Sequence, residues 1–180
     1  MEQEKSLYTL LVYSENIAGI LNQITAVFTR RQVNIESLNV SASSIEGLHK
    51  YTITAWSDED QISKITKQIE KKIDVVKAQY YHDDELYIRE TGLYKLSTPE
   101  VMANPEISRT VRRNDAFITE VNPIYVIVMK SGRTEEIMSL YDKLNSFGCI
   151  LQYTRSGRIA VTRSTEEEVS RYLEERQKYK

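Results

Sequence analysis

Few residues of this sequence have the types and the spacing that catalysis requires. A hydrolase or a transferase needs a nucleophile beside a base, but the two histidines, His49 and His82, lie in polar surroundings and far apart in the predicted fold. Neither histidine has a carboxylate pair at metal-ligand spacing. The single cysteine, Cys149, opens an apolar strand, where core packing is its expected role. The nucleotide-binding motifs G-x-G-x-x-G and G-x-x-x-x-G-K-[ST] are absent. The sequence therefore predicts neither a catalytic centre nor a metal site.

One loop has the composition of a ligand-binding site. The run N-I-A-G-I-L at residues 16–21 joins the first predicted strand to the first predicted helix. A glycine near a helix start allows a ligand to approach the backbone, and the amides and dipole of a helix N-terminus favour a carboxylate. Asn16 can both donate and accept hydrogen bonds, which suits a zwitterion. The same residues also fit an ordinary helix cap, so the loop alone leaves both interpretations open.

The composition is that of a globular protein, with 41% hydrophobic and 28% charged residues. A net charge of −2, from 24 basic and 26 acidic residues, argues against nucleic acid as the main partner. One cysteine excludes an intramolecular disulfide framework. No apolar run approaches the ~18 residues of a membrane span, and the polar start M-E-Q-E-K does not resemble a signal peptide. We therefore expect a soluble, cytoplasmic protein.

Hydrophobic periodicity predicts the order strand–helix–strand–strand–helix–strand in residues 1–80. Apolar residues recur on one face between Ile17 and Phe28, which predicts a helix that ends near Arg31. A second helix is expected to begin with Ser57 as its N-cap. Its core face should carry Ile62, Ile65 and Ile69. The predicted strands are residues 7–13, 34–41, 50–56 and 73–79.

The same order is predicted again after a charged break at residues 82–85. A helix is expected from Thr98 toward Arg113, and another over residues 133–145. The predicted strands are residues 86–96, 116–121, 124–129 and 149–154. A capping-box pattern at residues 164–167 then opens a C-terminal helix. The residues of this helix expected to face inward are Val169, Tyr172 and Leu173.

Two split βαβ units predict an α+β protein of two tandem ferredoxin-like βαββαβ sandwiches followed by a C-terminal helix. The predicted boundaries are 1–80 for the first domain, 81–85 for a linker, 86–163 for the second domain and 164–180 for the helix. In the first sheet, about half of the residues on each face are apolar. We therefore expect part of the face away from the helices, or a sheet edge, to meet a partner.

Several motifs together resemble the small regulatory subunit of acetolactate synthase, also called acetohydroxyacid synthase. The first are E-N-x-x-G-x-L at residues 15–21 and R-R-x-x-N-I-E-S-L at residues 30–38. Further similarities are I-D-V at 73–75, R-E-x-x-L-x-K at 89–95, F-G at 147–148 and R-S-G-x-x-x-x-x-R at 155–163. The resemblance covers residues 7 to about 163. The Asn/Gly loop alone would indicate only an ACT domain, the amino-acid-sensing ferredoxin-like module.

This resemblance implies a function in branched-chain amino acid biosynthesis, the pathway to valine, isoleucine and leucine. Residues 1–80 would be an ACT domain that forms a homodimer with its copy and binds a branched-chain amino acid, typically valine, at the interface. The chain would have no activity of its own. It would activate the large catalytic subunit and confer feedback inhibition. The cofactors thiamine diphosphate, magnesium and FAD are expected only in that catalytic partner.

The resemblance also implies the effector site. Asn16 and Gly19 would hold the carboxylate with neighbouring amides, and Asn34 would reach the effector from the partner subunit. The aliphatic side chain would be enclosed by Ile17, Ala18, Ile20 and Ile35.

Two departures from the family pattern affect these expectations. The family usually has Gly where this chain has Gln32, which puts the turn that positions Asn34 in question. The charged helix after residue 164 extends past the usual end of the family, and its role is unassigned.

The alternatives to this function are a stand-alone ACT-type sensor, a free-standing enzyme, or a ferredoxin-like RNA-binding module, for which Lys50 and Tyr51 are a faint signal.

Overall fold

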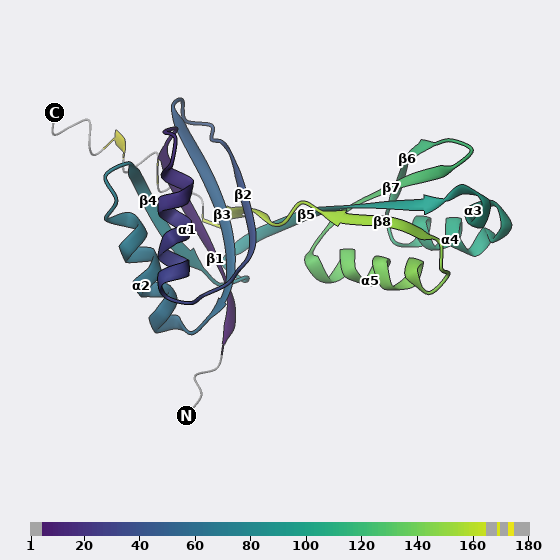
Figure 1. The fold of residues 1–180 in the computed structure, drawn as a ribbon, viewed down its shortest axis with the longest axis horizontal. Coiled ribbons are helices and arrows are strands. Elements are labelled where there is room, and N and C mark those ends of the chain that lie inside the picture. The colour runs from purple at the N-terminus through teal and green to yellow at the C-terminus, as the bar shows by residue number, and fades with distance from the viewer. Residues whose placement is uncertain (1–4, 165–168, 170–172, 175–180) are drawn as a thin grey trace. The chain divides into compact units, whose positions relative to one another are not determined.

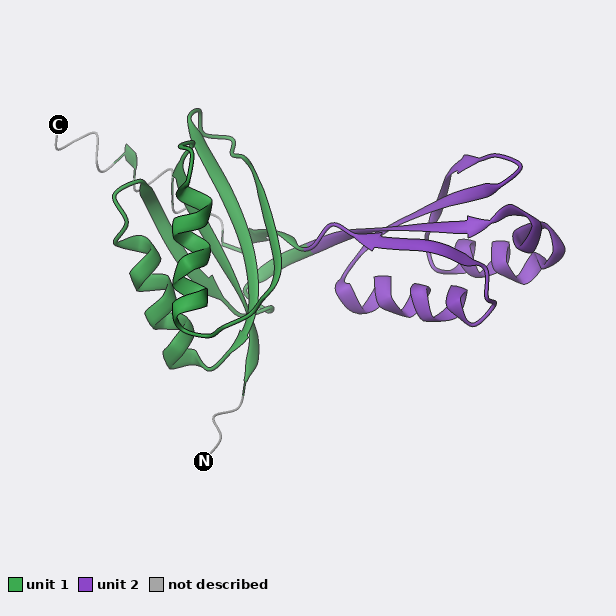
Figure 2. Ribbon diagram, viewed as in Figure 1, with its two compact units in different colours: residues 1–88, 158–180 green, residues 89–157 purple. Residues whose placement is uncertain are grey.

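The computed structural model describes residues 5–164, 169 and 173–174. The chain divides into two compact units, which Figure 2 shows in green and purple. Unit 1 comprises residues 1–88 and 158–180, and unit 2 comprises residues 89–157. Among the described residues, no helix is long and apolar enough to cross a membrane.

Unit 1 contains the first predicted βαββαβ pattern (Figure 1). Its elements are β1 (Ser6–Glu15), α1 (Ile20–Arg30), β2 (Ile35–Ala42), β3 (Leu48–Ser57), α2 (Glu59–Glu70) and β4 (Val75–Tyr81). The strands form an antiparallel sheet in the order β2-β3-β1-β4, and both helices cover one face of this sheet. This arrangement confirms the predicted ferredoxin-like sandwich.

The two helices of unit 1 bury the apolar faces that the periodicity predicts. Ile62, Ile65 and Ile69 of α2 are fully buried in the core against the sheet. The prediction of Ser57 as the N-cap of α2 is wrong, because Ser57 is the last residue of β3 and is buried. Asp58 is the N-cap, and its carboxylate accepts a hydrogen bond of 2.8 Å from the amide of Gln61.

The other face of this sheet is partly covered by the chain itself. Leu11 of β1 packs with Leu86, Ile88 and Ala160, which come from the start of β5 (Leu86–Ser97) and from β9 (Ile159–Thr162). Strand β9 was not predicted, and it pairs with β5. The start of β5 and the segment after residue 157 therefore belong to unit 1. The compact units divide the chain after residues 88 and 157, whereas the predicted boundaries are at residues 80, 85 and 163.

Two contacts within unit 1 fix the segment that was predicted as a linker. Arg158 is buried, and its guanidinium donates a hydrogen bond of 2.8 Å to the carboxylate of Asp83. The amide of Arg163 donates to the carbonyl oxygen of Glu85 over 3.0 Å. Residues 81–85 are thus an integral turn of unit 1.

The predicted C-terminal helix lies largely outside the described residues. Of the side chains expected to face inward, Val169 is buried and Leu173 is half-buried. Both belong to a cluster with Tyr13, Leu48 and Val76 on the sheet face away from the helices. Tyr172 lies outside the described residues.

Unit 2 repeats the topology of unit 1. Its elements are the remainder of β5, α3 (Thr98–Ala103), α4 (Pro105–Arg113), β6 (Phe117–Val121), β7 (Tyr125–Gly132), α5 (Thr134–Asn145) and β8 (Ile150–Arg155). The strand order is β6-β7-β5-β8, again antiparallel. Helices α4 and α5 pack on one sheet face, where Ile107 and Leu140 are fully buried beside Tyr94. The second predicted sandwich is thereby confirmed.

The single helix predicted from Thr98 to Arg113 is wrong. The chain leaves the helical conformation at Asn104, and a second helix begins at Pro105. The side chain of Asn104 accepts a hydrogen bond of 3.0 Å from the amide of Glu106 and thus caps α4. A proline inside a helical pattern disfavours the helical conformation of the residue before it, so this break could have been predicted.

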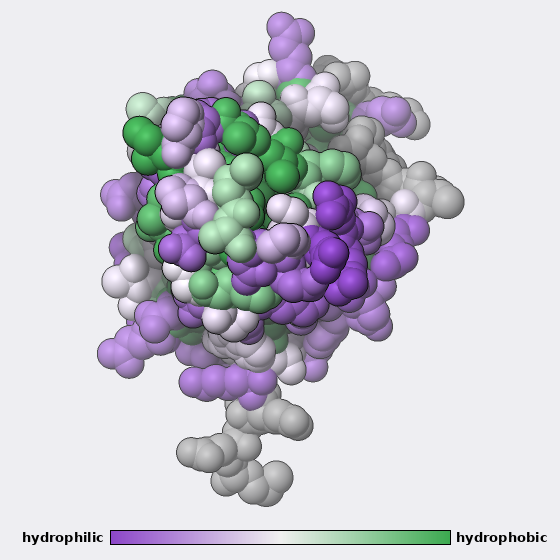
Figure 3. Space-filling view, turned by 90° about the vertical axis from the view of Figure 1, so that its right-hand side faces the viewer, coloured by the Kyte–Doolittle hydropathy of each residue, from purple (hydrophilic) through white to green (hydrophobic). Residues whose placement is uncertain are grey.

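Strand β6 forms an exposed edge of unit 2. All five of its residues are exposed, among them Phe117, Ile118 and Val121. Figure 3 shows hydrophobic and hydrophilic side chains mixed on the face that is turned toward the viewer. Short strands and charged neighbours are common ways to protect a sheet edge from pairing with other chains.

The turn after α1 retains the conformation that glycine favours, although Gln32 occupies it. Gln32 has a φ of 55°, and the next amide, that of Val33, returns to the carbonyl oxygen of Phe28 over 3.1 Å. We expect Gln32→Gly to raise the free energy of unfolding by about 0.5–1 kcal/mol, because a Cβ at positive φ is strained. Urea unfolding measures this difference, and Gln32→Ala, which keeps the Cβ, should give no gain. An equal gain in both variants would contradict the explanation by backbone strain.

Candidate functional site

The loop between β1 and α1 is an exposed turn held by backbone hydrogen bonds. The amide of Asn16 donates to the carbonyl oxygen of Gly47 over 3.2 Å, and the amide of Ile17 donates to that of Glu15 over 3.0 Å. Residues 16–19 are all exposed. The loop therefore presents its backbone and side chains to solvent from a fixed position at the end of β1.

Gly19 occupies the N-cap position of α1 in a left-handed conformation. Its φ is 89° and its ψ is −9°, a region that residues with a Cβ rarely adopt. A Cβ built at this position would meet no atom within 4 Å. The glycine is therefore required by the backbone, and the space beside it is open to a ligand.

The N-terminus of α1 lacks the groups that usually complete a helix start. In the part of the chain that the structure describes, Gly19 provides no side-chain cap, and the first turn of α1 has no acidic residue. Helix α2, in contrast, has Asp58 as its cap and Glu59 and Asp60 in its first turn. The amide of Ile20 donates to the carbonyl oxygen of Ile17 over 3.3 Å, but no side chain caps the other amides of this first turn, so they and the positive dipole end of α1 are available to an external carboxylate.

The apolar residues of this loop divide into exposed and buried side chains. Ile17 is 44% exposed and Leu21, in the first turn of α1, is 40% exposed. Ile20 lies in the core and is 3% exposed, and its amide donates to the carbonyl oxygen of Ile17 over 3.3 Å, so neither its side chain nor its amide is free for a ligand at the loop. Leu21 was not among the predicted site residues, although its place beside Gly19 and Ile20 in the sequence could have suggested it.

Asn34 and Ile35 lie at the other end of the sheet from this loop. Ile35 pairs with Ala55 of β3, which pairs with Tyr8 of β1, whereas the loop follows Glu15. The seven residue steps from Tyr8 to Glu15 correspond to about 23 Å at the usual rise of a strand. One chain alone therefore does not bring Asn34 and Ile35 to the loop that carries the other predicted site residues.

The side chains with catalytic potential are not brought together. Cys149 is fully buried, and its thiol lies 3.3 Å from the carbonyl oxygen of Leu144. Burial raises the pKa of this thiol, which disfavours the reactive thiolate. His82 is exposed and its ring lies against that of Tyr8 at a tilt of 56°, and His49 lies on β3. Among the described residues, no group of three or more His, Cys, Asp or Glu side chains could hold a metal ion.

Comparison with known protein families and structures agrees with this architecture. Residues 10–77 match the family of acetohydroxyacid synthase small subunit-like ACT domains, and residues 89–164 match the family described as the small subunit of acetolactate synthase. The chain resembles the crystal structure of the acetolactate synthase small subunit from Thermotoga maritima with a TM-score of 0.80 at 24% identity, over 89% of this chain and 99% of the other. This likeness supports the fold.

Two relatives extend the comparison to the sequence. The acetolactate synthase small subunit of Bacillus subtilis is 31% identical over 168 residues, which cover 92% of this chain and 95% of the relative. That of Haemophilus influenzae is 30% identical over 154 residues, which cover 86% and 94%. This chain belongs to the family of acetolactate synthase small subunits, as the family matches, the sequence identity over most of its length and the shared fold show.

Proposed function

We propose that this regulatory subunit binds a branched-chain amino acid, with valine as the first candidate, and transmits feedback inhibition to its catalytic partner. The observation that carries the proposal is the exposed, uncapped N-terminus of α1 at Gly19. An amino acid carboxylate would accept hydrogen bonds from the amides of this turn and interact favourably with the helix dipole. The exposed side chains of Ile17 and Leu21 would contact its aliphatic part.

The proposed site is completed by a second copy of the chain. Strand β2 lies at the edge of its sheet. If two β2 edges pair antiparallel about a two-fold axis, the Asn34 end of one strand lies beside the Ala42 end of the other. Ala42 pairs with His49, which pairs with Ser14 just before the loop. The homodimer would thus bring Asn34 of one chain to the end of the sheet at which the loop of its partner lies.

A catalytic subunit is the second partner that this proposal requires. The described residues bring together no nucleophile and base and no metal-ligating cluster, so the transferase chemistry would belong to another chain. In this proposal, thiamine diphosphate, magnesium and FAD are bound by that subunit. The small subunit would raise its turnover and make it sensitive to the amino acid.

Titration calorimetry of the purified chain with L-valine, L-leucine and L-isoleucine tests the proposal. We expect saturable binding of at least one of the three and no binding of D-valine, which has the same groups in the opposite configuration. In parallel, adding the chain to the catalytic subunit should raise its turnover. Binding without any change in turnover would favour a stand-alone ACT-type sensor, and the absence of both effects would reject the proposed function.

A further inference from the structure

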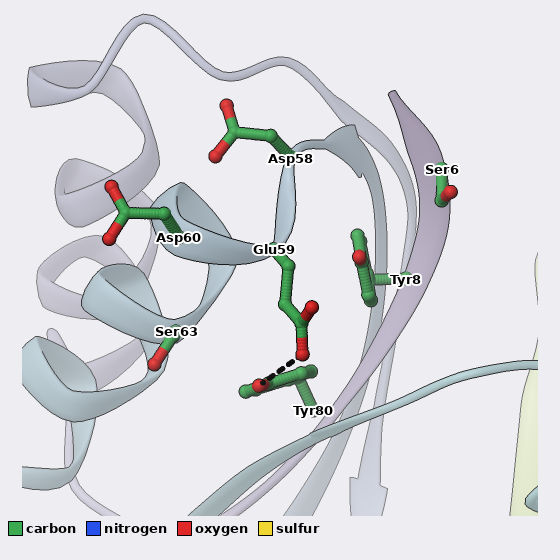
Figure 4. A pocket seen from close by; sticks show the side chains of 7 residues that line it. All are labelled: Ser6, Tyr8, Asp58, Glu59, Asp60, Ser63 and Tyr80. Carbon is green, nitrogen blue, oxygen red and sulfur yellow. Dashed lines mark hydrogen bonds between the residues drawn. The ribbon is translucent and has the colours of Figure 1, made fainter. Parts of the chain in front are cut away.

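A cavity lies in unit 1, at the end of β1 opposite the loop. Its volume is ≈ 650 Å³, and it is bordered by the start of β1, the first turns of α2 and the end of β4 (Figure 4). Side chains that line it include Tyr8, Asp58, Glu59, Asp60, Ser63 and Tyr80. In the part of the chain that the structure describes, three carboxylates and no basic side chain line the cavity, so its lining is acidic.

The three carboxylates of this cavity differ in how far they are engaged. Asp58 caps α2 through the amide of Gln61, and Asp60 forms an ion pair with the ammonium group of Lys64 at 2.5 Å. Glu59 accepts only a long hydrogen bond of 3.5 Å from the hydroxyl of Tyr80. Glu59 therefore keeps most of its capacity to accept hydrogen bonds.

Tyr8 places a second possible hydrogen-bond acceptor in this cavity. Its side chain is 4% exposed, and it lines the cavity beside Glu59 and Tyr80. Among the described residues, its hydroxyl has no hydrogen-bond partner. Burial, followed by the negative charge of Glu59, raises the pKa of this phenol, so the hydroxyl stays protonated at neutral pH. Thr9 Oγ1 is the only fully buried side-chain oxygen without a partner among the described residues, so the Tyr8 hydroxyl is open to the cavity, where it can accept a hydrogen bond from a bound donor.

Two tyrosine rings form a corner next to these acceptors. The rings of Tyr8 and Tyr80 meet edge to face, with centroids 5.7 Å apart and an interplanar angle of 83°. Aromatic faces beside carboxylates are the usual surroundings of organic cations. From the cavity, the free carboxylate of Glu59 and the unpartnered Tyr8 hydroxyl, we propose that this is a binding site for a guanidinium or alkylammonium group.

An organic cation fits the site better than a metal ion. The described residues offer no cluster that could hold a metal ion, whereas a planar guanidinium can bind a carboxylate through two donors and stack on a ring. The N-terminus of α2 carries only about half a positive charge, which is less than the negative charge of the three carboxylates. The cation could be a free metabolite or a basic side chain of the catalytic subunit, since both present the same chemistry.

Titration of the full chain with methylguanidinium, followed by NMR, tests this site. We expect saturable shifts at residues around the cavity, with a dissociation constant in the millimolar range, and none with sodium chloride at equal ionic strength. Glu59→Gln should weaken binding about tenfold or more, because it removes a charge-assisted hydrogen bond. Asp60→Asn removes the same charge from the same helical turn and should have a smaller effect, since Asp60 is already paired.

Three outcomes would overturn the proposal: no saturable shift, equal binding by Glu59→Gln and the wild type, or an equal response to sodium chloride. Tyr8→Phe adds a second test, because it removes only the unpartnered oxygen and should weaken binding without unfolding the chain. The affinity of the same variants for the catalytic subunit then identifies the source. A weaker complex for Glu59→Gln indicates a basic side chain of that subunit, and an unchanged complex indicates a free cation.

Discussion

Replacing Gly19 by Asp is expected to give a complex with the catalytic subunit that stays active but no longer responds to the amino acid. The new carboxylate would occupy the place of the effector carboxylate at the start of α1. Two carboxylates about 4 Å apart repel by roughly 4 kcal/mol at an effective dielectric of ~20, so the loss in affinity should be about a thousandfold. Calorimetry and inhibition assays of the complex measure this loss.

The conformation of Gly19 adds a cost that the sequence does not reveal. Near a helix start, Asp is normally well tolerated, and from the sequence the effect on the fold should be small. The φ of 89° places this residue in the left-handed region, where a side chain costs about 1–2 kcal/mol. We therefore expect Gly19→Asp to unfold at a lower urea concentration than the wild type while remaining folded under assay conditions.

Two controls separate charge from backbone strain. Gly19→Asn has nearly the same size and the same backbone strain but no charge, so it should bind the amino acid more tightly than Gly19→Asp. Gly148→Asp introduces the same residue at another glycine with positive φ, 68°, in unit 2, where a Cβ also meets nothing within 4 Å. It should lower stability but leave inhibition intact. Inhibition of Gly19→Asp at the wild-type concentration would place the effector elsewhere.

Sequence periodicity predicted the βαββαβ order of both units, because the main helices and strands each have an apolar face, but it did not predict β9 or the division into α3 and α4. The spacing of three and four residues between Ile62, Ile65 and Ile69 is that of one helix face, and all three side chains are fully buried. The missed strand has a physical cause. Strand β9 has only four residues, and it depends on pairing with β5, a distant partner that periodicity cannot reveal.

The candidate site could be predicted only in part. Residue types and the resemblance were enough to select Asn16, Gly19 and Asn34. Ile17 is exposed and Ile20 is buried because of the direction in which the loop enters the helix, and this direction cannot be predicted from the order of the residues. The separation of Asn34 from the loop follows from strand register, and register is set by pairings between residues far apart in the chain.

That separation leads to the strongest test of the paired site. Asn34→Asp is nearly isosteric, but it replaces the amide donors with a carboxylate, so its homodimer should also lose inhibition. In a mixed dimer of Gly19→Asp and Asn34→Asp chains, one site would combine both substitutions. The other site would combine the intact loop of one chain with the intact Asn34 of its partner.

Mixing two chains that are each insensitive to the amino acid should therefore restore part of the response. Random exchange of equal amounts gives half mixed dimers, each with one intact site of two, so about a quarter of all sites should recover wild-type affinity. Calorimetry after co-refolding measures this fraction, and mixing either variant with itself is the control. No recovery in dimers shown by native mass spectrometry to have exchanged would mean that one chain forms the site alone. Recovery would require that Asn34 acts on the loop of the other chain, because within one chain the two lie at opposite ends of the sheet.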